Sequence, residues 1–502
     1  MIIVPLLGSL LVFLFGKRDD IAKIVALTIS IIPLIISLIL LAGFVAPDTV
    51  QLHDYQYSAN STSHYKAYES ASWIPAIGVS YTLGVDGLSV TLVFLAALLT
   101  PLAMLFSWDE HHRVKEFYAM FLFMEATIIG VFVSLDFFLF FIFWEGGLIP
   151  MYFIIAVWGG PRKKYASMKF FLYTQAASVM VLLGIAAFYF YSGTFNMIEL
   201  IETTPVPPGI VSDLLFVGLL VGFGTKLPTW PLHTWLPDAH VEAPTAGSVM
   251  LAGVLLKLGG YGLIRVNVQM LPSAAIDLVW LLAVLGIVSI IYGAIVCIAQ
   301  DDLKRMVAFS SVSHMGFVTL GIAAGVFAIS QHKGDGVLAF SGAIFQLFAH
   351  GLVSAMLFMV AGSIGHKVGT RNISELGGFA AKTPRLSAFV MISFLASLGL
   401  PGLVGFVAEF SVFTGTYQAF GWLVALPLIS VLLTAAYYIY AMQRSMFGPL
   451  NPKLEKMLDT RSHEDVPLGV LAVLLAIFGI APFIFFDLIS KFSGPVLGVL
   501  GK

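Results

Sequence analysis

The chain has 502 residues, of which 59% are hydrophobic and 11% are charged, with a formal net charge of −2. Soluble domains carry about 25% charged residues, so this composition predicts a polytopic membrane protein and gives no reason to expect a nucleic-acid partner. The single cysteine, Cys297, excludes an internal disulfide, a cysteine-ligated zinc site and an iron–sulfur cluster held by this chain alone.

Apolar runs long enough to cross a bilayer predict about fourteen helices and an all-α fold. The expected spans are residues 2–16, 22–45, 84–107, 116–134, 136–158, 167–192, 211–232, 246–265, 275–299, 304–329, 337–365, 385–416, 421–447 and 467–490. In the first run the basic residues follow the apolar segment, which is the reverse of a signal peptide. We therefore expect a single integral domain over residues 1–502, with an outer loop at 46–81.

Basic residues are distributed unevenly between the predicted loops. Nineteen of the 26 Lys and Arg residues, Lys304 among them, fall in loops opposite the two termini. Five, including Arg265, fall on the side of the termini, and the remaining two are Lys226 and Lys257. Because cytoplasmic loops are enriched in Lys and Arg, both termini are predicted to lie outside.

The seventh and twelfth predicted helices are interrupted by proline and glycine, and each carries a similar tetrapeptide. Leu-Val-Gly-Phe occupies 220–223 and again 403–406, and a charged residue, Lys226 or Glu409, follows each phenylalanine by three positions. The tetrapeptides are five helices apart, an offset that inverts topology. The pattern predicts two inverted five-helix repeats, at about 116–265 and about 275–447, as in many transporters.

Charged residues within apolar helices are the main functional signal. A charge in the hydrocarbon core costs a few kcal/mol or more and is rarely present without a role. Lys226 and Lys257 lie in such segments, and a lysine in a low-dielectric surrounding gives up its proton more readily. Glu145, in the fifth helix, is the expected partner of Lys226. The alternative is a static ion pair that locks two helices, but Lys257 has no obvious static partner.

Four histidines, which titrate near neutral pH, extend this series. His314 and His350 are in mid-helix among small and hydroxylated residues, so we expect them to relay protons. His233 and His240 lie near a helix end, where structural hydrogen bonding explains them equally well. A haem or metal site is not expected, since no second deep histidine pair and no zinc-ligand spacing is present.

Three acidic residues complete the set of candidates. Glu409 is expected at the far end of the polar path, where it would receive or release the proton. Glu125 is a further possible participant. Asp136 lies in a short turn between two spans and is interpreted as an exposed charge at the membrane surface.

Several long motifs resemble the antiporter-like subunits of respiratory complex I. The resemblance runs from about residue 80 to 450. It rests on Trp144–Met151, Lys226–Gly247, Leu255–Arg265, Asp302–Gly316 and Gly399–Glu409. Of the three paralogous chains, L, M and N, this sequence is most similar to the M type (the mitochondrial chain 4 type), because L and N chains typically have lysine where Glu409 stands.

The resemblance implies a proton-translocating membrane-arm subunit of a complex I-type oxidoreductase. Its proton-channel residues would be Glu145, Lys226, Lys257, His314, His350 and Glu409, with Glu145 modulating Lys226. The expected partners are L- and N-type chains, lipid and a peripheral redox arm. That arm would hold FMN or FAD, iron–sulfur clusters and a quinone or phenazine, while this chain would bind no cofactor and no metal.

The sequence leaves other functions open. The alternatives are a subunit of a multi-chain sodium/proton antiporter, the membrane arm of an energy-converting hydrogenase, and a structural spacer in a membrane arm. The electron donor, whether NADH, ferredoxin or a reduced deazaflavin, is not indicated. The expected location is a prokaryotic plasma membrane.

Overall fold

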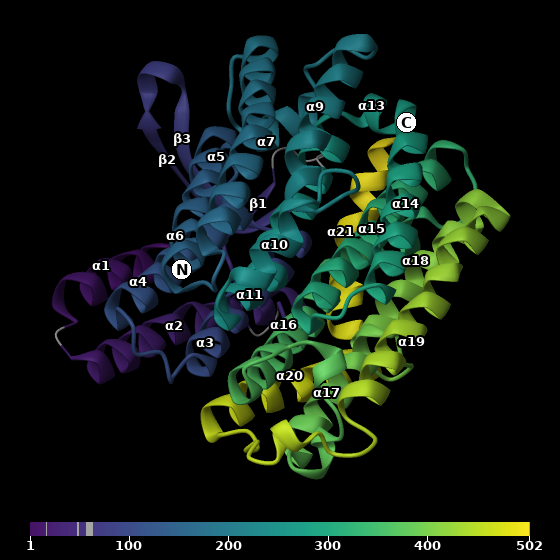
Figure 1. Ribbon diagram of the computed structural model, residues 1–502. Helices are drawn as coiled ribbons and strands as arrows, with labels where there is room; N and C mark the ends of the chain where they lie inside the picture. The colour runs from purple at the N-terminus through teal and green to yellow at the C-terminus, as the bar shows by residue number, and fades with distance from the viewer. Residues whose placement is uncertain (17, 48–49, 57–63, 501–502) are drawn as a thin grey trace.

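The computed structural model describes residues 1–16, 18–47, 50–56 and 64–500, and most of them are helical (Figure 1). The first half contains α1 (Ile3–Phe15), α2 (Asp19–Val45), α3 (Gly87–Phe106), α4 (Val114–Val133), α5 (Phe137–Gly146), α6 (Leu148–Trp158), α7 (Lys163–Ser192), α8 (Met197–Thr203), α9 (Ile210–Lys226), α10 (Trp235–Glu242), α11 (Thr245–Met250), η2 (Leu251–Leu255), α12 (Leu256–Gly262) and η3 (Leu263–Val268). The second half contains α13 (Pro272–Asp277), α14 (Val279–Ile298), α15 (Leu303–Ser330), α16 (Gly336–Val368), α17 (Pro384–Ser397), α18 (Val404–Phe420), α19 (Ala425–Ser445), α20 (Ser462–Ile480) and α21 (Phe483–Leu500).

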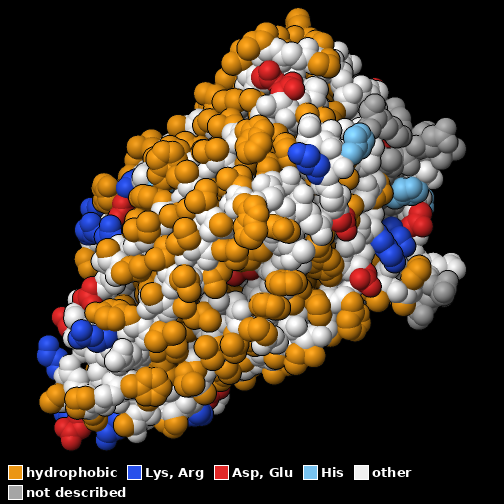
Figure 2. Space-filling view, turned by 90° about the vertical axis from the view of Figure 1, so that its right-hand side faces the viewer, with side chains coloured by type: hydrophobic (Ala, Val, Ile, Leu, Met, Phe, Trp, Pro, Cys, Tyr) orange, Lys and Arg blue, Asp and Glu red, His pale blue; other side chains and the backbone are white. Residues whose placement is uncertain are grey.

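Length and apolar composition make the bundle an integral membrane protein. In the part of the chain that the structure describes, twelve segments are long and apolar enough to cross a membrane. Figure 2 shows hydrophobic side chains over most of one face, with charged side chains gathered toward its ends. Both observations confirm the predicted polytopic all-α class, because lipid-facing helices expose apolar side chains between polar ends.

The central helix of the bundle is α16. It packs against α15 and α18 on one side and against α3, α20 and α21 on the other. Figure 1 shows α1 to α4 on one side of the molecule and α18 and α19 on the opposite side, with α16 between them. The most apolar 18-residue stretch of α16 is completely buried within the chain, whereas that of α2 is 28% buried. Charged side chains near α16 are therefore shielded from lipid by protein.

Most of the predicted spans coincide with observed helices to within a few residues, and the predicted breaks in the seventh and twelfth are present. The seventh breaks between α9 and α10, and the twelfth breaks between α17 and α18. The last predicted span, 467–490, is wrong in detail: it is two helices, α20 and α21, separated at Ala481 and Pro482. Proline at 482 cannot donate the backbone hydrogen bond that a continuous helix requires. The number of crossings, about fourteen, stays a prediction.

A small antiparallel sheet closes one end of the bundle. It consists of β1 (Asp54–Gln56), β2 (His64–Ile74) and β3 (Val79–Val85), in the order β1-β2-β3. Most of this sheet lies in the predicted outer loop 46–81, of which residues 48–49 and 57–63 lie outside the described part, and β3 continues past the loop to Val85. We call this end of the molecule the sheet end.

The opposite end, here called the basic end, holds several loops that are joined by ion pairs. Arg461 Nη1 lies 2.8 Å from Asp109 Oδ2, and Arg371 Nε lies 3.1 Å from Asp302 Oδ2. This clustering agrees with the predicted segregation of basic residues, although Lys17 and Lys502 lie outside the described residues. Which end faces the cytoplasm stays a prediction.

Three charged residues are buried more deeply than the sequence indicated. Asp136 has no exposed surface and accepts hydrogen bonds from the backbone N–H groups of Phe138 and Leu139, so it caps α5 rather than standing exposed. Arg265 is also fully buried, and Lys304 is 2% exposed. The interpretation of these two as loop charges was therefore wrong, because their side chains point into the bundle from helix ends.

The two tetrapeptides of the predicted repeat occupy different positions relative to their helix breaks. Residues 220–223 are in α9, ahead of the break, whereas Leu403 and the start of α18 follow the break. The inverted repeats at about 116–265 and about 275–447 therefore stay a prediction from the sequence.

Candidate functional site

Lys226 is the last residue of α9, at the point where the chain breaks. The following segment contains Pro228 and Pro231, which cannot donate backbone hydrogen bonds and therefore end the helix. The Lys226 side chain is 4% exposed, and its Nζ donates to the backbone carbonyl of Trp144 at 3.0 Å. The same Nζ lies 3.5 Å from the centroid of the Trp144 ring, a cation–π contact.

Glu145 lies beside this lysine without forming an ion pair with it. Its charge is close enough to act on Lys226, but the nearest described partners of the ammonium are the carbonyl and the ring of Trp144. Its buried Oε1 has no hydrogen-bond partner among the described residues. The predicted partners therefore interact electrostatically but form no ion pair in the described structure.

Lys257 is completely buried in a helix with two widened turns. The segment α11–η2–α12–η3 is continuous, and both η2 and η3 are π-helical. Lys257 Nζ lies 2.8 Å from His350 Nδ1 on α16 and also donates to the carbonyl oxygen of Ala252 in η2. π-helical turns within α-helices are frequent at functional sites. The sequence predicted the lysine but not the widened turns.

His350 leads to a second histidine and a carboxylate. The ring centroids of His350 and His314 are 5.7 Å apart. His314 Nδ1 lies 3.0 Å from Glu409 Oε1 on α18. Gly399 makes room for this carboxylate, because a Cβ at that position would lie 3.0 Å from Glu409 Oε2. Lys257, His350, His314 and Glu409 therefore form one polar row, with contacts of hydrogen-bond length at its two ends and neighbouring imidazole rings in the middle.

A row of hydroxyl groups continues from the other nitrogen of His314. Its Nε2 lies 3.1 Å from Ser397 Oγ, at the end of α17. Ser397 Oγ lies 2.7 Å from the hydroxyl of Tyr438 on α19, which donates to Ser310 Oγ at 3.2 Å. Each of these side chains is buried. His314 is thus bonded on both sides of its ring.

His240 lies between Lys257 and the basic end. It is fully buried, it stacks on Phe358 with centroids 4.3 Å apart, and neither ring nitrogen has a hydrogen-bond partner among the described residues. The charges of Lys257 and Lys304 both act on its imidazole. Buried polar groups are usually hydrogen-bonded, so the unpartnered imidazole of His240 is unusual within the bundle.

Lys304 reaches the same region from the start of α15. Its Nζ donates to the carbonyl of Ala243 at 2.8 Å and lies 3.4 Å from Ser248 Oγ, and no described carboxylate forms an ion pair with it. It lines a cavity of about 470 Å³ at the basic end, together with Glu242, Asp302 and Arg371. The ammonium is therefore placed between an accessible cavity and the buried His240.

Two predicted candidates lie apart from this row. His233 packs edge-on against Tyr292, with ring centroids 5.0 Å apart, and its Nδ1 is unpartnered in the described chain. Glu125, on α4, is fully buried, and neither of its carboxylate oxygens has a hydrogen-bond partner among the described residues. No described contact joins either residue to Lys257, His350, His314 or Glu409.

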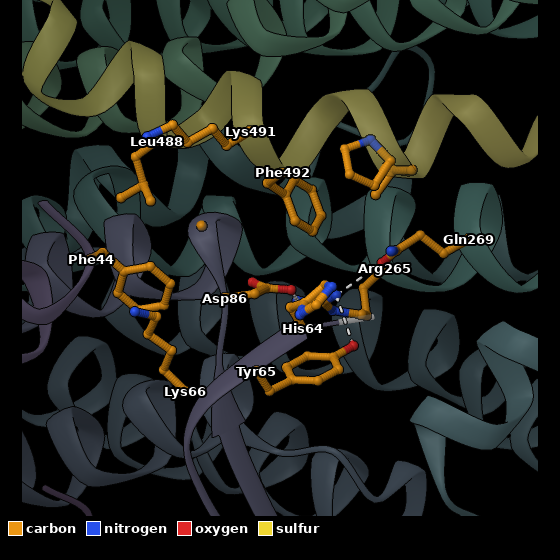
Figure 3. A pocket seen from close by; sticks show the side chains of 13 residues that line it. Phe44, His64, Tyr65, Lys66, Asp86, Arg265, Gln269, Leu488, Lys491 and Phe492 are labelled. Atoms are coloured by element: carbon orange, nitrogen blue, oxygen red, sulfur yellow. Dashed lines mark hydrogen bonds and ion pairs between the residues drawn. The ribbon is translucent and has the colours of Figure 1, made fainter. Parts of the chain in front are cut away.

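A separate ionic cluster lies at the sheet end. Arg265 Nη2 is 2.5 Å from Asp86 Oδ2, and Arg265 Nε donates to the hydroxyl of Tyr261 at 3.2 Å. Figure 3 shows this arginine directed at Asp86 and Tyr65, beneath Phe492 of α21. Because Asp86 also caps α3 by accepting from the N–H of Ser89, this cluster joins helices and sheet.

The sequence reasoning missed Lys304, Ser397 and Tyr438. For Lys304 the sequence did contain a signal, because this lysine is the second residue of its helix and follows the carboxylate of Asp302 by two positions. Serine and tyrosine are common in membrane helices, so nothing in the sequence distinguished Ser397 and Tyr438 from their neighbours. Their alignment becomes visible only when α15, α17 and α19 are packed together.

Residues 134–434 match the family described as NADH:quinone oxidoreductase/Mrp antiporter, TM. The chain belongs to this family. It is 44% identical over 467 residues to the F(420)H(2) dehydrogenase subunit M of Methanosarcina mazei, covering 91% of this chain and 92% of that protein. It is 40% identical over 484 residues to the NADH-quinone oxidoreductase subunit M of Rhodobacter capsulatus, covering 94% and 90% of the two chains.

Solved structures of this family share the fold. A chain of respiratory complex I from Thermus thermophilus is 27% identical, with a TM-score of 0.86 over 100% of this chain and 99% of that chain. A chain of the Mrp complex from Dietzia is 22% identical, with a TM-score of 0.82, and the match covers 99% of this chain but 52% of that one. The first likeness extends over both whole chains. The two relatives named subunit M confirm the resemblance to the subunit M type.

Proposed function

We propose that this chain is a proton-translocating membrane-arm subunit of a complex I-type oxidoreductase. The observation that carries the proposal is the buried row Lys257–His350–His314–Glu409, with contacts of 2.8 Å and 3.0 Å at its two ends. Such a row of titratable groups inside a membrane bundle is typical of a proton path. The relatives of 44% and 40% identity, which are subunits of oxidoreductase complexes, support the assignment of the complex.

The proposed path begins at the basic end. Lys304 takes up a proton from the cavity that it lines, and His240 passes it to Lys257. From there it moves through His350 and His314 to Glu409, which releases it toward the opposite side of the membrane or to a neighbouring subunit. Lysine and histidine suit this role because each binds a proton reversibly when its surroundings are changed by a nearby charge.

The Lys226 and Glu145 pair would control the path rather than carry the proton along it. Their charges act on each other, but the ammonium is bonded to Trp144 instead of the carboxylate. If Glu145 moves toward Lys226, the carboxylate neutralises the positive charge of Lys226.

The energy would come from electron transfer in partner subunits. We propose L- and N-type antiporter-like chains and a peripheral redox arm as partners, with FMN or FAD, iron–sulfur clusters and a quinone or phenazine in those subunits. This chain would hold no redox centre, and its residues would only bind and release protons. The proposed location is a prokaryotic plasma membrane with both termini outside.

The decisive experiment is to purify the tagged chain with its native partners and to measure proton movement. The complex would be reconstituted in proteoliposomes with a trapped pH dye, and electron donor and quinone would be added. We expect co-purifying iron–sulfur and flavin subunits, and proton transport that stops when electron transfer is inhibited. An assembly of membrane chains alone that exchanges sodium for protons would instead identify an antiporter. Normal proton transport by a complex with Lys257→Ala would indicate that this chain is a structural spacer.

A further inference from the structure

We propose that Tyr438 fixes which nitrogen of His314 exchanges a proton with Glu409. The inference rests on the proposed function and assigns a positioning residue to it. Tyr438 does not contact Glu409 directly. It acts through Ser397, whose hydroxyl lies 2.7 Å from the Tyr438 hydroxyl and 3.1 Å from His314 Nε2.

The row of hydroxyls has a single consistent assignment of donors. Ser310 donates its only hydroxyl proton to the carbonyl of Val307 at 2.8 Å. It is therefore an acceptor for Tyr438, at 3.2 Å. With the Tyr438 proton engaged in that bond, Ser397 must donate to the Tyr438 oxygen. Each hydroxyl carries one proton and accepts with its lone pairs.

The assignment determines the tautomer of His314. Because the proton of Ser397 points to Tyr438, Ser397 can only accept from His314, and the proton of the neutral imidazole must be on Nε2. The opposite nitrogen, Nδ1, then has a free lone pair directed at Glu409 Oε1, 3.0 Å away. In a neutral imidazole one nitrogen donates and the other accepts, so fixing one fixes the other.

This arrangement restricts the proton exchange to one line. When Glu409 is protonated, its O–H donates to Nδ1 and both groups are neutral. Transfer breaks that O–H bond and forms an Nδ1–H bond, which leaves a carboxylate and an imidazolium, while the Nε2–H bond to Ser397 is unchanged. The reverse transfer restores the neutral pair. No other proton has to move in this step of the path, so Glu409 and His314 exchange a single proton in it.

The groups that face His314 come from each packed helix. His350 and Gln346 on α16, Ser397 on α17 and Glu409 on α18 line the small cavity around its ring. The buried Oε1 of Gln346 has no described hydrogen-bond partner, and its Nε2 donates to the backbone carbonyl of His314 at 3.5 Å rather than to the ring. Among the described residues only the hydroxyl row bonds Nε2, so that row decides whether Nε2 keeps its proton.

The test compares Tyr438→Phe with Tyr437→Phe in the reconstituted complex. Both variants remove one buried tyrosine hydroxyl from adjacent positions of α19, but the Tyr437 hydroxyl, whose neighbours are Thr434, Cys297 and Tyr438, makes no hydrogen bond of good geometry with a described residue and bonds neither Ser397 nor Ser310. Loss of the Tyr438 hydroxyl frees Ser397 to donate to Nε2, which admits the other tautomer. We expect the rate of proton transport coupled to electron transfer to fall about fivefold, the equivalent of one ordinary hydrogen bond, and its pH profile to shift. Tyr437→Phe should change neither.

Two further variants guard against a merely structural effect. Ser397→Thr keeps a hydroxyl and should retain transport, whereas Ser397→Ala should reproduce the loss and the shifted pH profile of Tyr438→Phe. The inference would be overturned if both Tyr438→Phe and Tyr437→Phe transported protons normally. It would also be overturned if both variants lost transport to the same extent. Glu409→Gln distinguishes a failure of the proposed function from a failure of the inference about Tyr438. Normal proton transport by Glu409→Gln would contradict the proposed function as well. Loss of transport in Glu409→Gln together with normal transport in Tyr438→Phe would contradict only the role of Tyr438.

Discussion

The Lys257 ammonium lies 2.8 Å from Nδ1 of His350, and both side chains are buried in the centre of the bundle. An ammonium can only donate, so this contact requires a bare Nδ1 on a neutral imidazole whenever Lys257 is charged. Protonation of both groups at once would bring two positive charges together in a low-dielectric region. In the proposed path the two residues would therefore hold one proton alternately.

The first prediction concerns Lys257. Lys257→Ala should leave electron transfer uncoupled or stopped and abolish proton transport through this subunit, because the central group of the row is lost. The measurement is dye-reported proton transport in proteoliposomes that contain the assembled complex. Lys382→Ala is the matched control, since Lys382 is exposed in a loop at the basic end. Transport by Lys257→Ala at the rate of Lys382→Ala would contradict a central role.

The second prediction concerns proton uptake at Lys304. Lys304→Arg keeps a positive charge beside the carbonyl of Ala243 but replaces it with a group that does not release protons at any working pH. The complex should assemble, yet transport should fall by about tenfold or more, in the range expected for loss of a positioned acid–base group. Lys164→Arg, at an exposed position, should transport normally. Full activity of Lys304→Arg would show that the charge alone is needed.

The third prediction concerns Glu145. Glu145→Gln preserves the size of the side chain but removes the charge that acts on Lys226. Transport coupled to electron transfer should be lost while the complex still assembles, as judged by subunit composition on native gels. The control is Glu455→Gln, in an exposed loop. If assembly fails in Glu145→Gln alone, the pair has a structural role.

The fourth prediction concerns the ionic cluster at the sheet end. Asp86→Asn would leave Arg265 buried without a counter-charge, and breaking a buried pair costs about 3–5 kcal/mol. The variant complex should unfold at a lower temperature and be recovered in lower yield. Asp54→Asn is the comparison, because its contact with Lys66 is 4.0 Å long and 70% of the Asp54 side chain is exposed. That exposed pair should contribute less than about 1 kcal/mol.

The fifth prediction concerns pH. Burial alone would raise the pKa of Asp459, but the backbone N–H groups of Leu386 and Arg385, each 3.0 Å from a carboxylate oxygen, outweigh it and lower the pKa. These donors belong to the first turn of α17, so Asp459→Ala should destabilise the protein by about 0.5–2 kcal/mol, as loss of a cap does.

The pH dependence of that loss follows from the direction of the shift. A carboxyl with a lowered pKa stabilises the fold above its ordinary pKa of about 3.9, and the contribution disappears as the pH falls through the lower folded value. The difference in thermal midpoint between Asp459→Ala and the unchanged complex should therefore be constant from pH 6 to 8 and shrink below about pH 4. A difference that grows on acidification would contradict the assignment.

Charges inside apolar segments were the part of the site that the sequence could predict. Lys226, Lys257 and Glu409 stand out because hydrocarbon disfavours them wherever their helices lie. Arg265 and Lys304 did not stand out in the sequence. A basic side chain near a helix end can either extend to water or turn inward, and tertiary packing decides which. The hydroxyls of Ser397 and Tyr438 were hidden for a related reason, because their function depends on three helices meeting.

The fold was predictable to the same degree. Hydrophobic length located the helices, and proline with glycine located the breaks after α9 and α17. The sheet at residues 54–85 and the division of 467–490 into two helices were missed, because both depend on what the neighbouring helices leave uncovered. The amino-acid sequence alone also could not predict that Glu125 and His233 lie apart from the polar row.

The two π-helical turns that flank Lys257 also set the rotational phase of its helix. An α-helix turns about 100° per residue, and a π turn accommodates one residue more than an α turn. Leu251–Leu255 and Leu263–Val268 each hold such a surplus residue, one before and one after the lysine. If the first turn relaxed to ordinary α-helix, Lys257 would rotate away from His350 while its height in the membrane barely changed. The widened turns thus fix the direction in which Lys257 faces His350.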